Sequence, residues 1–357
     1  MSSITSDSDS DSDAMLGSRG VSYDCDAFVT SLAFTRASNF GVFALGSGSL
    51  LALDLSTKTW TETRVCEGAI LTVAADFDSN GILAGGDDGS LLRLELGGVP
   101  QLVQIGKFPA KWVEHVTTIP DKKNAIRVVA VGKTVHLLGP DGATLRTLDH
   151  SSTVTGVVLD AKMRRIGTSH YNGASVWFVR AEQTKPQLLE WKGSHIGIAI
   201  HPAFNAVVTA MQENALHGWR MPDGQHMRMS GYSAKPQSLG FSASGRWLAS
   251  SGAESIILWP FFGGGPMGKA PLELAGHNQA IVRQIACHPG NEVVAAGFSD
   301  GMVVIADIVR ERILPIASPG RGPVSALSWS PDGSMLGFGT ETGFAAVVDF
   351  TSKLEEN

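Results

Sequence analysis

The sequence has little of what secreted, membrane-spanning or helical proteins need. Its three cysteines, Cys25, Cys66 and Cys287, have no regular spacing, which argues against a disulfide framework and favours a reducing cytoplasm. No run of 18 apolar residues occurs, and no basic start precedes an apolar segment, so neither a transmembrane helix nor a secretory signal is expected. No stretch has the 3.6-residue apolar period of a helix.

Clustered positive charge is also missing. The net charge is −6, and four of the negative charges are Asp7, Asp9, Asp11 and Asp13 in the run SDSDSDSD. A nucleic-acid-binding face needs clustered Lys and Arg, so we expect no nucleic-acid partner. The Ser-Asp run has no apolar group to bury, and we predict a disordered acidic tail over residues 1–19.

Catalytic motifs are absent as well. The chain contains no His-Glu-x-x-His and no phosphate-binding glycine loop ending in Lys-Ser or Lys-Thr. The sequence therefore predicts a non-catalytic protein without a cofactor or a bound metal.

What the chain does have is a unit that recurs eight times. Each unit reads as an apolar strand, a turn, a second strand, a glycine turn and a third strand. The last apolar residues of the eight first strands are 40 to 46 residues apart: Phe34, Ala75, Ile119, Leu159, Ile200, Phe241, Cys287 and Trp329. Four-stranded propeller blades recur every ~40–45 residues. The repeat predicts an all-β chain folded as one closed propeller of four-stranded antiparallel blades.

Eight blades are favoured by the repeat, with seven as the alternative if the third unit is an insertion. The last unit lacks a fourth strand, and residues 20–26 (GVSYDCD) supply one if they pair with it and close the ring. The predicted propeller spans residues 20–352, and residues 353–357 form a C-terminal tail.

Several residues resemble the hallmarks of the WD40-repeat family: the Gly276-His277 pair, the Asp300-Gly301 turn and the Leu258-Trp259 strand end. In that family a His, a Ser or Thr, an Asp and a Trp form a hydrogen-bonded network that fastens each blade. The resemblance implies such structural roles for five residues of this chain: His277, Asp300, Trp177, Trp219 and Trp259.

Three histidines form a second group of candidates. The WD40 template places the entry loops holding His150 and His195 near the turn holding His170 and Tyr171. Imidazole can ligate zinc, but no cysteine or acidic pair completes the set, and the family uses His at such positions as a structural hydrogen-bond partner. We treat these four residues as candidate partner contacts and expect no metal.

The segment Trp259–Lys269 (WPFFGGGPMGK) interrupts the repeat most strongly. Two adjacent aromatic residues, Phe261 and Phe262, are followed by three glycines. Apolar side chains on a mobile loop predict a partner contact. The alternative is that one Phe tucks under the blade edge while the glycines span the gap.

Together these observations predict a protein-interaction scaffold that is cytoplasmic and monomeric and has protein partners but no membrane partner. Three segments, GSHIGIAIHP, TAMQENALHGW and WPFFGGGPMGKAPLELAG, are similar to those of stand-alone WD-repeat proteins of proteobacteria, and that resemblance suggests a link to a metal-chaperone GTPase. The first alternative is a metal-handling or small-ligand propeller that uses the histidine-bearing face. A hydrolase or lactonase propeller comes third.

Overall fold

The computed structural model describes residues 13–121, 123–181, 185–221, 223–276 and 279–351. The chain forms two compact units. Unit 1 consists of Met1–Asp13 and Val154–Gly320, and unit 2 consists of Ala14–Thr153 and Arg321–Asn357. In the described part, unit 2 adds one short helix, α2 (Ala14–Arg19), to an otherwise all-β structure.

Unit 2 holds four antiparallel sheets of four strands each. The first three are β2-β3-β4-β5, β6-β7-β8-β9 and β10-β11-β12-β13, and the fourth is β1-β30-β29-β28. Their strands are β1 (Gly20–Asp24), β2 (Val29–Phe34), β3 (Phe40–Leu45), β4 (Ser49–Asp54), β5 (Thr59–Arg64), β6 (Ile70–Ala75), β7 (Gly81–Gly86), β8 (Ser90–Glu95), β9 (Gln101–Lys107), β10 (His115–Ile119), β11 (Ile126–Val131), β12 (Thr134–Leu138), β13 (Thr144–Asp149), β28 (Val324–Trp329), β29 (Met335–Thr340) and β30 (Phe344–Asp349).

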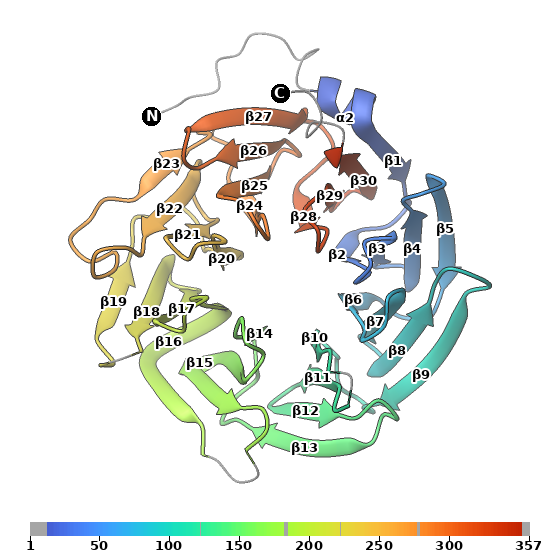
Figure 1. Ribbon diagram of the computed structural model, residues 1–357, viewed down its shortest axis with the longest axis horizontal. Helices are drawn as coiled ribbons and strands as arrows, with labels where there is room; N and C mark the ends of the chain where they lie inside the picture. The colour runs from blue at the N-terminus through green and yellow to red at the C-terminus, as the bar shows by residue number, and fades with distance from the viewer. Residues whose placement is uncertain (1–12, 122, 182–184, 222, 277–278, 352–357) are drawn as a thin grey trace. The chain divides into compact units, whose positions relative to one another are not determined.

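The predicted closing strand is confirmed. Strand β1 pairs antiparallel with β30, from Gly20 opposite Val348 to Asp24 opposite Phe344, and the two strands lie side by side in Figure 1. The contact continues past the strand, because the backbone N–H of Cys25 donates to the carbonyl of Gly343 at 2.7 Å. The start of the described chain thus completes the sheet formed by its end.

Unit 1 holds one sheet of six strands and two of four. The order is β14-β15-β16-β17-β18-β19 in the first sheet, followed by β20-β21-β22-β23 and β24-β25-β26-β27. Their strands are β14 (Gly156–Leu159), β15 (Arg165–Phe178), β16 (Gln187–Ile200), β17 (Ala206–Met211), β18 (Ala215–Arg220), β19 (His226–Met229), β20 (Leu239–Phe241), β21 (Trp247–Ser250), β22 (Ile256–Pro260), β23 (Leu272–Leu274), β24 (Val282–Cys287), β25 (Val293–Phe298), β26 (Val303–Asp307) and β27 (Arg312–Ala317).

The prediction of eight blades is wrong. The strands form seven sheets, six four-stranded and one six-stranded, which makes the fold an all-β propeller of seven blades. The fourth and fifth sequence units share β16, whose first half pairs with β15 and whose second half pairs with β17; Figure 1 shows it running on without a break. Asn172 and Gly173, with φ values of 67° and 142°, lie at a β-bulge within β15.

The repeat itself was predicted correctly at the level of strands. Each of the eight anchor residues is the last residue of a strand: β2, β6, β10, β14, β16, β20, β24 and β28. The third unit is not an insertion, because β10–β13 form a complete four-stranded sheet. The count of seven arises from the fusion of two units at β16.

Burial is greatest in the second strand of each sequence unit. All six residues of β7, β11, β17 and β29 are buried, whereas β5 and β9 are mostly exposed. Burial on both faces explains why the second strands are continuous runs of Val, Ala, Ile and Gly rather than alternating sequences. Apolar clusters join successive sheets within each unit, for example Val42 and Leu50 with Ile82 and Leu94.

The predicted tails are described only in part. Residues 14–19, assigned from the sequence to the disordered tail, form helix α2, in which Leu16 is buried. Ordered structure therefore begins earlier than predicted, because Leu16 gives this segment an apolar side chain to bury. Residues 1–12 and 352–357 lie outside the described residues.

Candidate functional site

The segment between β22 and β23 forms a fixed loop rather than a loose connection. Gly263, Gly264 and Gly265 have φ values of 59°, 94° and 99°, a region that L side chains rarely adopt. The Nζ of Lys269 donates to the carbonyl of Gly263 at 3.1 Å and also to that of Phe262. These bonds fold the glycine turn back onto its own start.

Phe261 is not a free contact. Its ring packs edge-on against Phe241 at 4.9 Å between centroids, and it joins the core cluster that contains Leu248 and Trp259. Its backbone N–H donates to the carbonyl of Arg246 at 2.7 Å. The structure thus follows the alternative in which one Phe tucks beneath the loop, and that residue is Phe261; a partner contact at Phe261 stays a prediction.

Phe262 is the accessible member of the pair, with 38% of its surface exposed. Its ring lies edge-on to Trp247 at 5.2 Å. The Arg246 guanidinium is 4.9 Å from the ring centroid and the Lys269 ammonium is 5.1 Å from it, both within the range of cation–π attraction. Phe262 is thus held in one position while part of its surface stays open to solvent.

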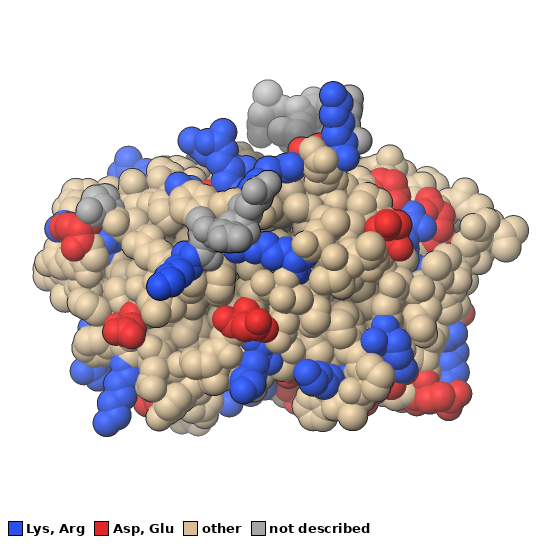
Figure 2. Space-filling model, turned by 90° about the horizontal axis from the view of Figure 1, so that it is seen from below, with Lys and Arg blue, Asp and Glu red and all other residues tan. Residues whose placement is uncertain are grey.

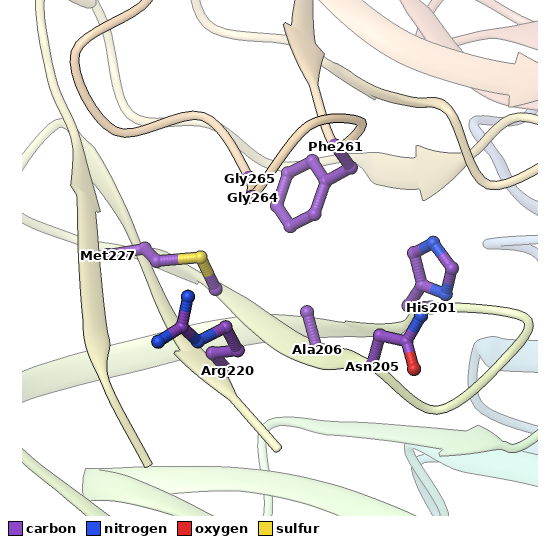
Figure 3. Close-up of a pocket in the computed structure, with 8 residues that line it drawn as sticks. All are labelled: His201, Asn205, Ala206, Arg220, Met227, Phe261, Gly264 and Gly265. Atoms are coloured by element: carbon purple, nitrogen blue, oxygen red, sulfur yellow. The ribbon is translucent and has the colours of Figure 1, made fainter. Parts of the chain in front are cut away.

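A cavity of about 300 Å³ lies beside this loop. Figure 3 shows Phe261 and Met227 pointing into it, with Ala206, Asn205 and His201 along another wall. The remaining lining residues are Arg220, Gly264 and Gly265. The Arg220 guanidinium bonds Asp223 and holds the pKa of that carboxyl down at about 2, so this pair contributes little net charge to the cavity rim.

We predict that replacing Phe261 and replacing Phe262 lower the free energy of unfolding by different amounts. Phe261→Ser lowers the free energy of unfolding by about 1–3 kcal/mol, less than the ~3–5 kcal/mol of a fully buried Phe, because the side chain is half-buried. Phe262→Ser changes it by less than about 1 kcal/mol. Urea unfolding of both variants checks this; equal losses would contradict the placement of the two rings.

The candidate histidines of unit 1 are buried and hydrogen-bonded. The Nε2 of His195 donates to the carbonyl of Trp191 at 2.9 Å, and its Nδ1 lies 2.7 Å from the hydroxyl of Thr209. In His170 the two ring nitrogens lie 3.0 Å from the carbonyl of Tyr171 and 2.8 Å from the hydroxyl of Ser175. Burial lowers the pKa of His195. A metal ion would have to displace these bonds from both rings.

The other two candidates of this group differ in exposure. Tyr171 is 55% exposed on β15, opposite Ser194 of β16. His150 belongs to unit 2, where its Nδ1 lies 3.2 Å from the carbonyl of Lys133. Among the described residues, no group of three or more His, Cys, Asp or Glu side chains is arranged to hold a metal ion.

The tryptophans of the predicted blade network are buried, with 8% of Trp177, 2% of Trp219 and 8% of Trp259 exposed. Trp259 Nε1 donates to the Tyr232 hydroxyl at 2.8 Å, and that hydroxyl lies 2.6 Å from Ser250 Oγ. The Tyr232 hydroxyl thus links the Trp259 and Ser250 side chains. Burial raises the pKa of Tyr232 to about 12.

The remaining two network candidates are Asp300 and His277. Asp300 Oδ1 accepts a hydrogen bond from the backbone of Met302 at 3.0 Å, and the Asp300 carbonyl accepts one from Gly320 at 2.8 Å. His277 lies outside the described residues. The sequence did not indicate Tyr232, because a tyrosine is not part of the motif.

A second aromatic cluster was also missed. The buried ring of His217 stacks on Trp191 at 3.9 Å with an interplanar angle of 13°, and its Nε2 lies 2.9 Å from Nδ1 of His226. No hydrogen-bond partner among the described residues reaches His217 Nδ1 or Trp219 Nε1. The register of β18 on β19, with Trp219 opposite His226, brings three of these residues together, and Trp191 comes from β16; the sequence does not reveal this arrangement.

The His217 cluster predicts a pH dependence. Burial, followed by the neighbouring His226, His195 and Arg228, lowers the pKa of His217 to about 3. Its unfolded pKa is about 6.5, so as the pH falls the unfolded chain takes up the proton first. The contribution of neutral His217 to the free energy of unfolding is complete above about pH 6.5 and is lost as the pH falls. The loss is about 2 kcal/mol between pH 6.5 and pH 5.

Urea unfolding at pH 7 and pH 5 measures this dependence. His195 and His201 also have lowered pKa values through burial and contribute to the wild-type slope. His217→Gln should show a shallower loss than wild type, whereas the control His150→Gln should match wild type. Parallel slopes for His217→Gln and wild type would contradict the assignment.

Charge is distributed evenly on the face shown in Figure 2, where basic and acidic side chains are interspersed and separated by uncharged residues. Within the residues that the structure describes, no helix is both long and apolar enough to cross a membrane.

Comparison with known proteins identifies one repeat of the chain. Residues 268–307 match the family model described as WD domain, G-beta repeat. No curated protein matches the chain. Among solved structures, the crystal structure of the computationally designed Ika8 protein is similar, with a TM-score of 0.70, 20% identity, and coverage of 91% of this chain and 97% of that one. A likeness at this identity is evidence for the fold alone.

Proposed function

We propose that this chain is a WD40-repeat β-propeller that serves as a non-catalytic protein-interaction scaffold. WD40-type propellers commonly serve this role, although a fold by itself does not fix a function. The site must therefore support the proposal. The loop between β22 and β23 is the candidate contact surface.

The observation that supports this proposal most strongly is Phe262. Its side chain is 38% exposed, yet it is held between Trp247, Arg246 and Lys269 on a loop closed by hydrogen bonds. A large apolar side chain that is both exposed and fixed contacts a partner at low entropic cost. Packing of the sheets does not require it, since Phe261 already fills the space beneath the loop.

The metal-handling alternative has less support. Both ring nitrogens of His170 and of His195 already have hydrogen-bond partners. No observation favours the hydrolase or lactonase alternative. We further propose a cytoplasmic, monomeric bacterial protein whose partners are proteins rather than nucleic acid or membrane; the three segments similar to proteobacterial WD-repeat proteins support this origin.

Affinity capture followed by reconstitution tests the scaffold proposal. The tagged wild-type chain is used to capture partners from a lysate of its source, and the dissociation constant of the main partner is then measured with purified proteins. We expect Phe262→Ser to weaken binding at least tenfold. The matched control is Val309→Ser, which removes another exposed apolar side chain, 77% exposed and in the turn after β26.

Two results count against the proposal. The first is the absence of any partner that binds the purified wild-type chain with a Kd below about 100 μM. The second is turnover of a metabolite by the purified chain, which would place the protein in the enzyme class. Retention of the partner by Phe262→Ser would leave the scaffold function intact but remove this loop from it.

A further inference from the structure

Two cations without carboxylate partners flank Phe262. Among the described residues, no carboxylate lies within 4.0 Å of the Arg246 guanidinium or of the Lys269 ammonium, in contrast to Arg220, which is paired with Asp223. We call Arg246, Phe262 and Lys269 the Phe262 patch. With the Arg220–Asp223 pair neutral overall, the patch carries two net positive charges.

The orientation of Arg246 leaves its hydrogen-bonding capacity unused. Its guanidinium lies over the Phe262 ring at 4.9 Å, and the side chain has no hydrogen-bond partner among the described residues. A guanidinium stacked on a ring still presents its N–H groups at its edge, where they can bind a carboxylate in two-point fashion. Lys269 donates two of its three N–H groups to the carbonyls of Phe262 and Gly263, which leaves one for a ligand.

The neighbouring cavity limits the size of an apolar group that can enter. Its volume of about 300 Å³ is at the lower end of the ~300–1,000 Å³ found for small-molecule sites. Phe261, Met227 and Ala206 give the cavity an apolar lining, and Gly264 and Gly265 at the loop leave backbone exposed. This space suits one large side chain better than an extended cofactor.

We propose that the Phe262 patch and this cavity together bind an acidic peptide segment of a partner protein, with one large apolar side chain of the segment in the cavity and acidic side chains on Arg246 and Lys269. This inference rests on the proposed scaffold function and names the chemistry of its partner. Two cations, Lys269 on the loop and Arg246 just before β21, are too few for a nucleic acid or a lipid surface, which bind to clusters of Lys and Arg.

A phage-displayed library of random 12-residue peptides tests the proposal. The library is selected on wild-type protein and counter-selected on Arg246→Glu. Peptides that survive should carry at least two Asp or Glu residues around a Phe, Leu, Met or Trp. Synthetic copies should bind wild type in fluorescence anisotropy and bind Arg246→Glu at least tenfold more weakly. Changing the apolar residue of the peptide to Ala should cost a similar factor.

The control variant is Arg312→Glu, which reverses an exposed arginine of the same unit on β27 and should bind the peptides like wild type. Enrichment of basic peptides, no enrichment over Arg246→Glu, or equal loss in Arg312→Glu would overturn the proposal. Binding to phosphatidylserine vesicles in place of peptides would also overturn it. If a captured partner binds wild type and Arg246→Glu equally, the scaffold function stands and this inference fails.

Discussion

Replacing Asp76 by alanine should lower the free energy of unfolding by about 3–5 kcal/mol, the usual cost of removing one partner from a buried ion pair. The Asp76 side chain is inaccessible to solvent. Its carboxylate lies 2.8 Å from Nε of Arg93 and 2.9 Å from Nη2 of Arg127, and the Asp76 carbonyl accepts a hydrogen bond from Arg36. Alanine would leave the buried Arg127 guanidinium without a counter-charge, whereas Arg93 would keep Asp78 and Glu95 as partners.

The position of this cluster explains the size of the expected effect. Arg36 follows β2, Arg93 lies on β8 and Arg127 lies on β11, so three consecutive sheets of unit 2 meet at Asp76. Urea unfolding measures the loss. The control Arg310→Ala breaks an exposed ion pair with Asp307 and should cost less than about 1 kcal/mol. A loss below about 1 kcal/mol in Asp76→Ala would show that the cluster does not hold these sheets together.

Deleting residues 1–26 should lower the melting temperature by about 10 °C, whereas deleting residues 1–12 should change it little. Only the longer deletion removes β1, whose five residues pair with β30, and Cys25, which is buried against unit 2 residues. Each lost ladder bond costs about 0.5–1.5 kcal/mol, and 1 kcal/mol corresponds to about 2–4 °C in a domain of 150–250 residues. The exposed edge of β30 would also favour aggregation.

A point variant tests the closing strand without removing any residue. Gly343 has a φ of 96°, and a Cβ at this position would lie 1.9 Å from the carbonyl oxygen of Cys25. Gly343→Ala should therefore lower the melting temperature in the same direction as the longer deletion. If the two deletion variants have the same melting temperature, and Gly343→Ala has that of wild type, then β1 does not stabilise the last sheet.

The sequence predicted the strands well because short-range chemistry determines where they end. Turn residues and apolar runs placed all eight first-strand ends, and the unpaired last unit indicated the closing strand β1. The number of sheets was not predictable in this way. Gly193, with a φ of 132°, lies inside β16 rather than at the end of a strand. This continuity depends on the pairing of β16 with both β15 and β17, and such pairing involves residues distant in the sequence.

The candidate site shows the same division. The unusual composition of the Trp259–Lys269 segment marked the loop, but only packing against Phe241 distinguishes Phe261 from Phe262. No sequence motif indicated Tyr232 or the Asp76 cluster, because the residues that they bond lie on other strands and in other sheets. The histidines were identified as hydrogen-bonding residues by type, yet their partners Thr209 and Ser175 became known only from the structure.

The central claim is that the loop between β22 and β23 is a contact surface for a partner protein. Hydrogen–deuterium exchange of the purified chain, alone and in complex with its main captured partner, tests this most directly. We expect slower exchange in the complex for the backbone amides of residues 261–269, together with Arg246 and Trp247 beneath the loop. Protection confined to other strands, with unchanged exchange across residues 261–269, would contradict the claim.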